Sequence, residues 1–141
     1  AANSIMPPVL GYWKLRGLGQ SIRLMLEYIG EPWEEKLYHE GPPPNCLKDS
    51  DWLPVKYTFG FDFPTLPYYI DGPVKLTHSN AILRHLARKH GMDGSTEEEK
   101  IQVDVVENQI RDLRRDFSNL IYNTYDTDRE KYLENVPAIL K

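Results

Sequence analysis

Cysteine is nearly absent from this chain, because Cys46 is the single one among 141 residues. No internal disulfide bond and no Cys-x-x-Cys redox pair can form, which excludes a disulfide scaffold and favours the reducing cytoplasm. The four histidines show no pair at zinc-like spacing with Cys46. We therefore expect a cytoplasmic protein without a metal site.

Basic character and long apolar runs are also lacking. The chain has 17 Lys and Arg against 21 Asp and Glu, a net charge of -4, whereas nucleic-acid-binding domains usually carry clustered basic residues. No apolar run approaches the roughly 20 residues of a membrane span. Residues 1–5 resemble no signal peptide, and we interpret residues 1–6 as a cloning remnant with the starting Met6. We expect a soluble protein with a small-molecule partner, and neither nucleic acid nor membrane.

The first 90 residues contain an ordered series of strand and helix signals. Residues 9–13 read as a strand, four apolar residues at helical spacing follow between 22 and 29, and residues 33–38 read as a second strand. Gly41 and three prolines then predict a loop over residues 40–50. An Asp71-Gly72 turn predicts a hairpin, and apolar spacing at residues 82–86 predicts a helix that ends near Gly91. The predicted order is βαβ, connector, ββα.

The character of the sequence changes after Gly91. Residues 91–96 are interpreted as a linker, and Ser95 and Thr96 followed by Glu99 predict a capping box. A long helix is expected from residue 97, because apolar residues keep helical spacing for more than four turns. Another helix is expected to begin at Lys131.

Two segments resemble the glutathione transferases when taken together and in this order. They are residues 10–17 (LGYWKLRG) and residues 66–72 (LPYYIDG), the second continuing to THSNAIL at 77–83. The Tyr12-Trp13 pair and the long loop before Trp52 are similar to the mu class. The resemblance implies a thioredoxin-like α/β domain with a mixed sheet over residues 7–90, then an all-α domain, here partial, over residues 97–141.

The resemblance implies an enzyme that conjugates the thiolate of reduced glutathione to small hydrophobic electrophiles in detoxification. Glutathione is the co-substrate, no cofactor is needed, and a homodimer is expected. A free thiol has a pKa of about 8.5, so the enzyme must stabilise its anion. By resemblance Tyr12 is the hydroxyl donor to sulfur, although a strand-end tyrosine can also be plain core. Trp13 and Leu18 are expected to contact glutathione, and Trp13 equally suits packing.

Further glutathione contacts are implied by the same resemblance. Thr65, Leu66 and Pro67 match a cis-proline turn that offers backbone groups to the cysteinyl part, but the mu class has Asn in place of Thr65. His78 and Ser79 match the binding place of the γ-glutamyl end at a helix start, but the family usually has Gln in place of His78. Ser79 is also readable as a simple N-cap.

The glycyl carboxylate of glutathione is assigned by resemblance to Trp52 and Lys56. The mu class carries an arginine shortly before that tryptophan, where this chain has Lys48 and Asp49. Lys48 keeps the charge without bidentate geometry, whereas Asp49 would repel a carboxylate. A lone lysine in a loop is also readable as solvated.

Three more residues are assigned outside this cluster by the resemblance. Asp112 matches an acid that reaches the γ-glutamyl amine across a dimer interface, Tyr122 matches a tyrosine of the electrophile pocket, and Phe63 matches the aromatic key that enters the partner subunit. Each is equally readable as an ordinary exposed or core side chain.

Two rival functions stay open on the sequence. A non-catalytic binding or structural protein on the same fold is one, since folds do not fix function, and the departures at Asp49, Thr65 and His78 favour it. A thiol-disulfide oxidoreductase is the other, and the missing Cys-x-x-Cys pair disfavours it.

Overall fold

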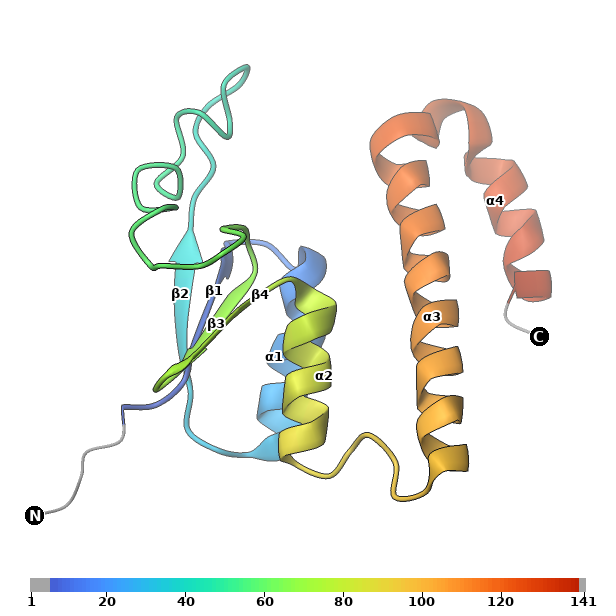
Figure 1. Cartoon of the computed structure of the whole chain (residues 1–141). Coiled ribbons are helices and arrows are strands. Elements are labelled where there is room, and N and C mark those ends of the chain that lie inside the picture. Colours follow the sequence, from blue (N-terminus) through green and yellow to red (C-terminus); the bar gives the residue numbers. More distant parts are fainter. Residues whose placement is uncertain (1–5, 140–141) are drawn as a thin grey trace, which may run out of the picture. The chain divides into compact units, whose positions relative to one another are not determined.

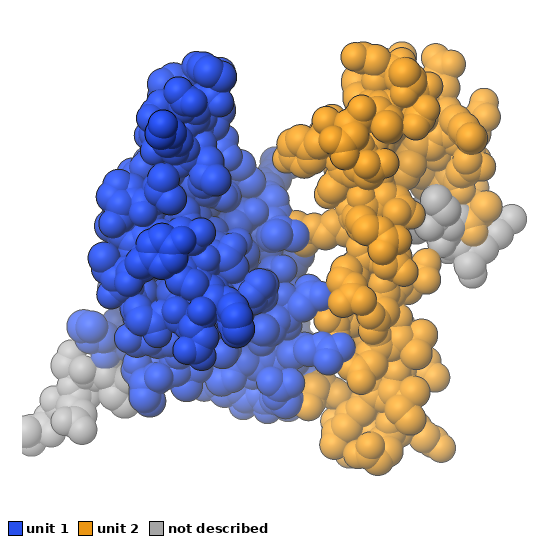
Figure 2. Space-filling model, turned by 45° about the horizontal axis from the view of Figure 1, so that its top comes forward, with its two compact units in different colours: residues 1–92 blue, residues 93–141 orange. Residues whose placement is uncertain are grey.

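A computed structural model describes residues 6–139 of the chain. Of the predicted cloning remnant with its starting Met at residues 1–6, residues 1–5 lie outside the described residues. The chain divides into two compact units, with the boundary between Met92 and Asp93. Figure 2 colours the two units separately. In the described part, no helix is both long and apolar enough to cross a bilayer.

The first unit is built on a four-stranded mixed sheet (Figure 1). Its strands are β1 (Val9–Trp13), β2 (Glu34–Tyr38), β3 (Tyr68–Asp71) and β4 (Val74–Thr77), in the spatial order β2-β1-β3-β4. β1 pairs in parallel with β2 and antiparallel with β3, which pairs antiparallel with β4. The predicted α/β class with a mixed sheet is confirmed.

Two helices and a short 3-10 turn complete the first unit. The turn η1 (Gly17–Gly19) leads directly into α1 (Gln20–Ile29), and α2 (Ser79–Lys89) follows β4. α1 ends where Gly30 takes a left-handed backbone with φ 74°, a conformation that glycine adopts without steric cost. Both helices lie on the same side of the sheet (Figure 1).

Side chains alternate between the two faces of the sheet, as strand geometry requires. Leu10 and Tyr69 face α1 and α2, where they form one core cluster with Ile22, Leu26, Ile82 and Leu86. Tyr68 points to the opposite face and forms a second cluster with Tyr38 and Trp52. The long loop between β2 and β3 covers this face with its own apolar residues, which are Val55, Phe59 and Phe61.

Glycine at position 11 is required by the close approach of a ring. A Cβ atom built on Gly11 would lie 2.1 Å from Cε1 and Cζ of Tyr68. The two residues are register partners on β1 and β3, so the ring lies directly against Gly11. The buried hydroxyl groups of Tyr68 and Tyr38 lie 2.9 Å apart and share a hydrogen bond. Burial raises the pKa of both phenols, and the pair is therefore neutral.

We expect His85 on α2 to make the stability of the first unit dependent on pH. Its Nε2 is buried without a partner among the described residues, and its ring lies 6.1 Å from that of Tyr69. Burial lowers the pKa of His85, as do the neighbouring cations Lys89, Arg88 and His90, whereas Asp71 opposes them. A lowered folded-state pKa contributes stability that is present above the unfolded value of about 6.5 and is lost as pH falls through the folded value.

We expect the His85→Phe variant to lose less stability on acidification than the parent chain. Phenylalanine keeps a ring against Tyr69 but cannot bind a proton. Urea unfolding of both proteins at pH 7.5 and pH 5.5 measures the difference. An equal loss in the two proteins would show that His85 does not carry the dependence.

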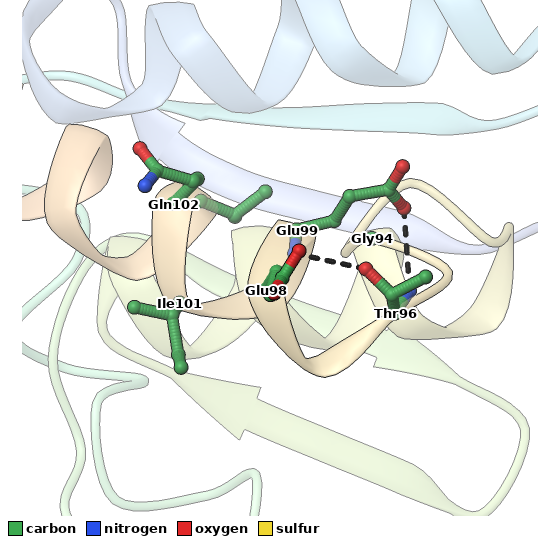
Figure 3. A pocket seen from close by; sticks show the side chains of 7 residues that line it. Gly94, Thr96, Glu98, Glu99, Ile101 and Gln102 are labelled. Carbon is green, nitrogen blue, oxygen red and sulfur yellow. Dashed lines mark hydrogen bonds between the residues drawn. The ribbon is translucent and has the colours of Figure 1, made fainter.

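The second unit is a helical hairpin. α3 (Glu97–Asn119) passes through a π-helical segment, η2 (Leu120–Thr124), into α4 (Tyr125–Ile139), and α4 folds back along α3 (Figure 1). Phe117 and Tyr132 are in ring contact at 6.4 Å between centroids. The predicted capping box is present, because the Thr96 hydroxyl accepts from the Glu99 N–H and the Glu99 carboxylate accepts from the Thr96 N–H (Figure 3).

The predicted start of the last helix at Lys131 is wrong, since α4 begins six residues earlier at Tyr125. The first turn of α4 carries Asp126 and Asp128, which favour a helix N-terminus through the helix dipole. No loop separates the two helices, because η2 continues directly from α3 into α4.

Candidate functional site

The register of the sheet brings three separated segments to one end. Gly11 of β1 pairs with Tyr68 of β3, and Tyr68 pairs with Thr77 of β4. The next residues beyond this row are Tyr12 on β1, Pro67 before β3 and His78 after β4. Three of the predicted glutathione contacts therefore meet at the same end of the sheet.

Tyr12 lies at this end of the sheet, and its hydroxyl oxygen accepts one hydrogen bond. The side chain is 5% exposed, and its hydroxyl accepts a hydrogen bond from the Leu18 N–H at 2.9 Å. This bond occupies an acceptor position and leaves the hydroxyl proton free to be donated. The ring is buried, as the plain core interpretation expects, but the hydroxyl has the arrangement that a donor to sulfur needs.

Two glycines of η1 allow the chain to close over Tyr12. A Cβ at Gly17 would lie 2.6 Å from the Tyr12 hydroxyl oxygen, and one at Gly19 would lie 2.5 Å from Cδ1 of the same ring. Gly17 also has φ +34°. Close approach of the backbone is what brings the Leu18 N–H to the hydroxyl.

The segment before β3 has the predicted backbone geometry. The Leu66-Pro67 peptide bond is cis, as the resemblance implies. Thr65 and Leu66 are half-buried, and Pro67 is fully buried. The structure also has a cis bond between Pro43 and Pro44, which the sequence did not indicate.

The start of α2 differs from the simple N-cap interpretation of Ser79. Ser79 is the first residue of the helix, and the cap position belongs to His78, which makes no side-chain capping bond. His78 has φ 68°, a left-handed value that is unusual outside glycine. Such backbone costs on the order of 1–3 kcal/mol and is concentrated at binding sites. The Ser79 hydroxyl is therefore not used as the cap of α2.

Trp13 and Trp52 lie on the face of the sheet that is opposite to α1 and α2. Trp52 is 3% exposed and stacks on Phe59 and Tyr68, with ring centroids 6.0 and 5.9 Å away. Trp13 packs against the same cluster and is half-buried. Both rings pack against this cluster, and their predicted contacts with glutathione stay predictions.

The sequence of the first unit matches a known protein family. The family model described as Glutathione S-transferase, N-terminal domain, matches residues 8–88. The chain belongs to the glutathione S-transferase family. Glutathione S-transferase Mu 2 of Pongo abelii is 51% identical over 137 residues, which are 96% of this chain and 62% of that protein. Mu 4 of Mus musculus is 49% identical with the same coverage.

Solved structures agree with this family assignment. The Pi-class glutathione S-transferase of Onchocerca volvulus superposes with a TM-score of 0.81 at 31% identity, over 96% of this chain and 60% of that one. The glutathione S-transferase Blo t 8 gives a TM-score of 0.77 at 35% identity, over 94% and 58%. The predicted resemblance is confirmed. The chain spans about three fifths of the length of the relatives it matches.

Two lysines, Lys48 and Lys56, lie at the surface of the long loop between β2 and β3. The Nζ of Lys56 is 5.3 Å from the centroid of the Tyr57 ring, and the Lys56 side chain is half-exposed. Lys48 and Asp49 are exposed in a turn of the same loop, where a Cβ on Gly41 would meet Asp49 at 2.5 Å. Lys56 is thus free to reach a carboxylate.

Of the remaining predicted site residues, Phe63 and Tyr122 are exposed and Asp112 is half-buried. Phe63 is 74% exposed in the loop before β3, and Tyr122 is 78% exposed in η2. Asp112 on α3 forms a surface ion pair with Arg115 at 3.0 Å. Their roles as dimer key, pocket residue and γ-glutamyl contact stay predictions.

Sequence reasoning missed Arg23 of α1. Its guanidinium carbon lies 5.8 Å from the centroid of the Tyr12 ring, and its nitrogens reach the turn that follows Tyr12. The only sequence feature that pointed to Arg23 is its position directly after Ile22, beside the apolar face of the predicted helix. Among the described residues, no group of three or more His, Cys, Asp or Glu is arranged to hold a metal ion.

Proposed function

We propose that this glutathione S-transferase conjugates reduced glutathione to small hydrophobic electrophiles. The observation that carries the proposal is the Tyr12 hydroxyl, which accepts from the Leu18 N–H and keeps its proton for another acceptor. It lies at the end of the sheet where the cis Leu66-Pro67 turn and the start of α2 also lie. The names and identities of the Mu-class relatives support the same activity.

In the proposed reaction, Tyr12 donates a hydrogen bond to the glutathione sulfur and stabilises its thiolate. The sulfur lone pair then forms a bond to an electron-poor carbon of the electrophile. In a substitution the leaving group departs with its bonding electron pair. In an addition the carbanion formed takes a proton from solvent.

The rest of glutathione would be held by the other predicted contacts. The backbone of Leu66 pairs with the cysteinyl part, and the N–H groups at the start of α2 beside His78 and Ser79 favour the γ-glutamyl carboxylate. Lys56 supplies the charge for the glycyl carboxylate. We propose a cytoplasmic homodimer in which Asp112 contacts the γ-glutamyl amine and Tyr122 lines the electrophile pocket. The exposed Phe63 supports the dimer.

Charge reversal at Lys56 tests the proposed function. The full chain should bind glutathione in calorimetry and conjugate an activated aryl halide. The Lys56→Glu variant should bind about tenfold more weakly, since the loss of an attraction and the gain of a repulsion together cost about 1–2 kcal/mol. Glutathione amidated at the glycyl carboxyl group should bind the variant and the parent alike.

The matched control is Lys100→Glu, which makes the same charge change on α3 at a lysine that pairs with Glu97. It should leave glutathione binding unchanged. Normal binding by Lys56→Glu would overturn the assignment of the loop. Binding of glutathione without any turnover would favour the non-catalytic alternative.

A further inference from the structure

Arg23 joins the turn after β1 to the neighbouring strand. One terminal nitrogen donates to the carbonyl oxygens of Leu15 at 2.9 Å and Arg16 at 3.4 Å. The other donates to the Trp13 carbonyl oxygen at 3.4 Å, and Nε donates to the carboxylate of Glu35 on β2. One planar guanidinium thus holds three carbonyl groups of a single short turn.

The turn held by Arg23 also carries the backbone N–H that donates to the Tyr12 hydroxyl. It connects Tyr12 at the end of β1 to Leu18, whose N–H the hydroxyl accepts. The guanidinium also lies against the Tyr12 ring, at 5.8 Å between its carbon and the ring centroid. Only 15% of the Arg23 side chain is exposed, and its bonds to the Trp13 carbonyl and the Gln20 amide oxygen are partly buried.

We propose that Arg23 is a positioning residue for the thiolate-stabilising hydroxyl. Its fork of donors fixes the turn so that the Leu18 N–H occupies an acceptor position of Tyr12 and directs the hydroxyl proton outward. Arg23 acts through Tyr12, and it needs no contact with glutathione. The inference rests on the proposed function for its effect on sulfur, but its effect on the Leu18 N–H is independent of it.

The charged groups around Arg23 are few. Glu35 faces it from β2, and the Gln20 amide oxygen faces it from α1 at 3.4 Å. The other partners are neutral carbonyl groups. Lysine in place of Arg23 would keep the charge near Glu35 but would lose the planar fork that spans the turn. Methionine would keep only the aliphatic stem.

The first readout uses the chain without glutathione. Hydrogen exchange of the Leu18 amide, followed by NMR, should accelerate about tenfold or more in Arg23→Met and Arg23→Lys, since loss of about 1.4 kcal/mol is a tenfold change in opening. The control Arg88→Met removes an exposed guanidinium from α2 and should leave this amide unchanged. Unchanged Leu18 exchange in both Arg23 variants overturns the proposal, whatever the activity.

The second readout is the pKa of bound glutathione, titrated by thiolate absorbance. We expect both Arg23 variants to raise it by about one unit, with little change in glutathione affinity. In a Tyr12→Phe background, Arg23→Met should add no further shift, because the two residues act as one unit. Additive shifts would overturn the proposal.

The two proposals fail in different ways. A shift in Tyr12→Phe without one in the Arg23 variants overturns only the role of Arg23. Failure of the parent chain to bind glutathione overturns the proposed function, and the Leu18 exchange result still decides the structural part. If Arg23→Met fails to fold, Arg23→Lys gives the same test, as does the milder Glu35→Gln, which weakens one anchor by removing its charge.

Discussion

Replacing Gly11 with alanine is expected to lower the free energy of unfolding of the first unit by about 3 kcal/mol, the upper part of the range for overpacking. The added Cβ would meet the Tyr68 ring at 2.1 Å, far inside van der Waals contact. The ring cannot move aside easily, because it is buried and its hydroxyl is bonded to Tyr38. Urea unfolding measures the loss, which is a large part of the roughly 5–15 kcal/mol of a typical domain.

A coupled variant separates this clash from other effects of losing glycine. In a Tyr68→Leu background the ring is gone, and Gly11→Ala should cost at least about 1 kcal/mol less than in the parent. Gly30→Ala is the matched control, since Gly30 has φ 74° and nothing within 4 Å of a built Cβ. It should cost about 1–2 kcal/mol from backbone strain alone. Equal costs of Gly11→Ala in both backgrounds would contradict the clash.

Local sequence signals were sufficient for the elements of the first unit. Helical spacing, the Asp71-Gly72 turn and the run of prolines each act over a few residues, and the strands β1, β3 and β4 lie where these signals place them. The two-faced core follows from the alternation along β3, where Tyr68 and Tyr69 point to opposite clusters. The capping box at Thr96 is a similarly local pattern.

Features that depend on distant contacts could not be predicted in this way. The burial of Trp52 depends on how a loop of many residues folds onto Tyr68. The bond between Arg23 and the turn after β1 joins residues that only the completed fold brings together. The left-handed backbone of His78 is imposed by the join between β4 and α2, and a histidine gives no sign of it. The site was therefore predictable as a set of segments, but its supporting contacts were not.

The role of Tyr12 has a large expected effect on chemistry and a small one on the fold. Phenylalanine keeps the ring that packs under η1 and against Arg23, and it removes only the hydroxyl. The Leu18 N–H loses its partner, but Leu18 is 43% exposed, so water can replace it. Glutathione affinity should change little, because the other contacts remain.

The pKa of glutathione bound to Tyr12→Phe is expected to rise by about one to two units, since one hydrogen bond to an anion is worth about 1.5–3 kcal/mol. At neutral pH the thiolate fraction, and with it the conjugation rate, should then fall by up to about a hundredfold. The rate should recover as the pH is raised, because the thiol then ionises without the hydroxyl. Ultraviolet titration of the bound thiolate and the pH profile of kcat/KM measure both effects. An unchanged titration midpoint would remove Tyr12 from the proposed mechanism and leave the backbone N–H groups at the end of the sheet as the stabilising donors.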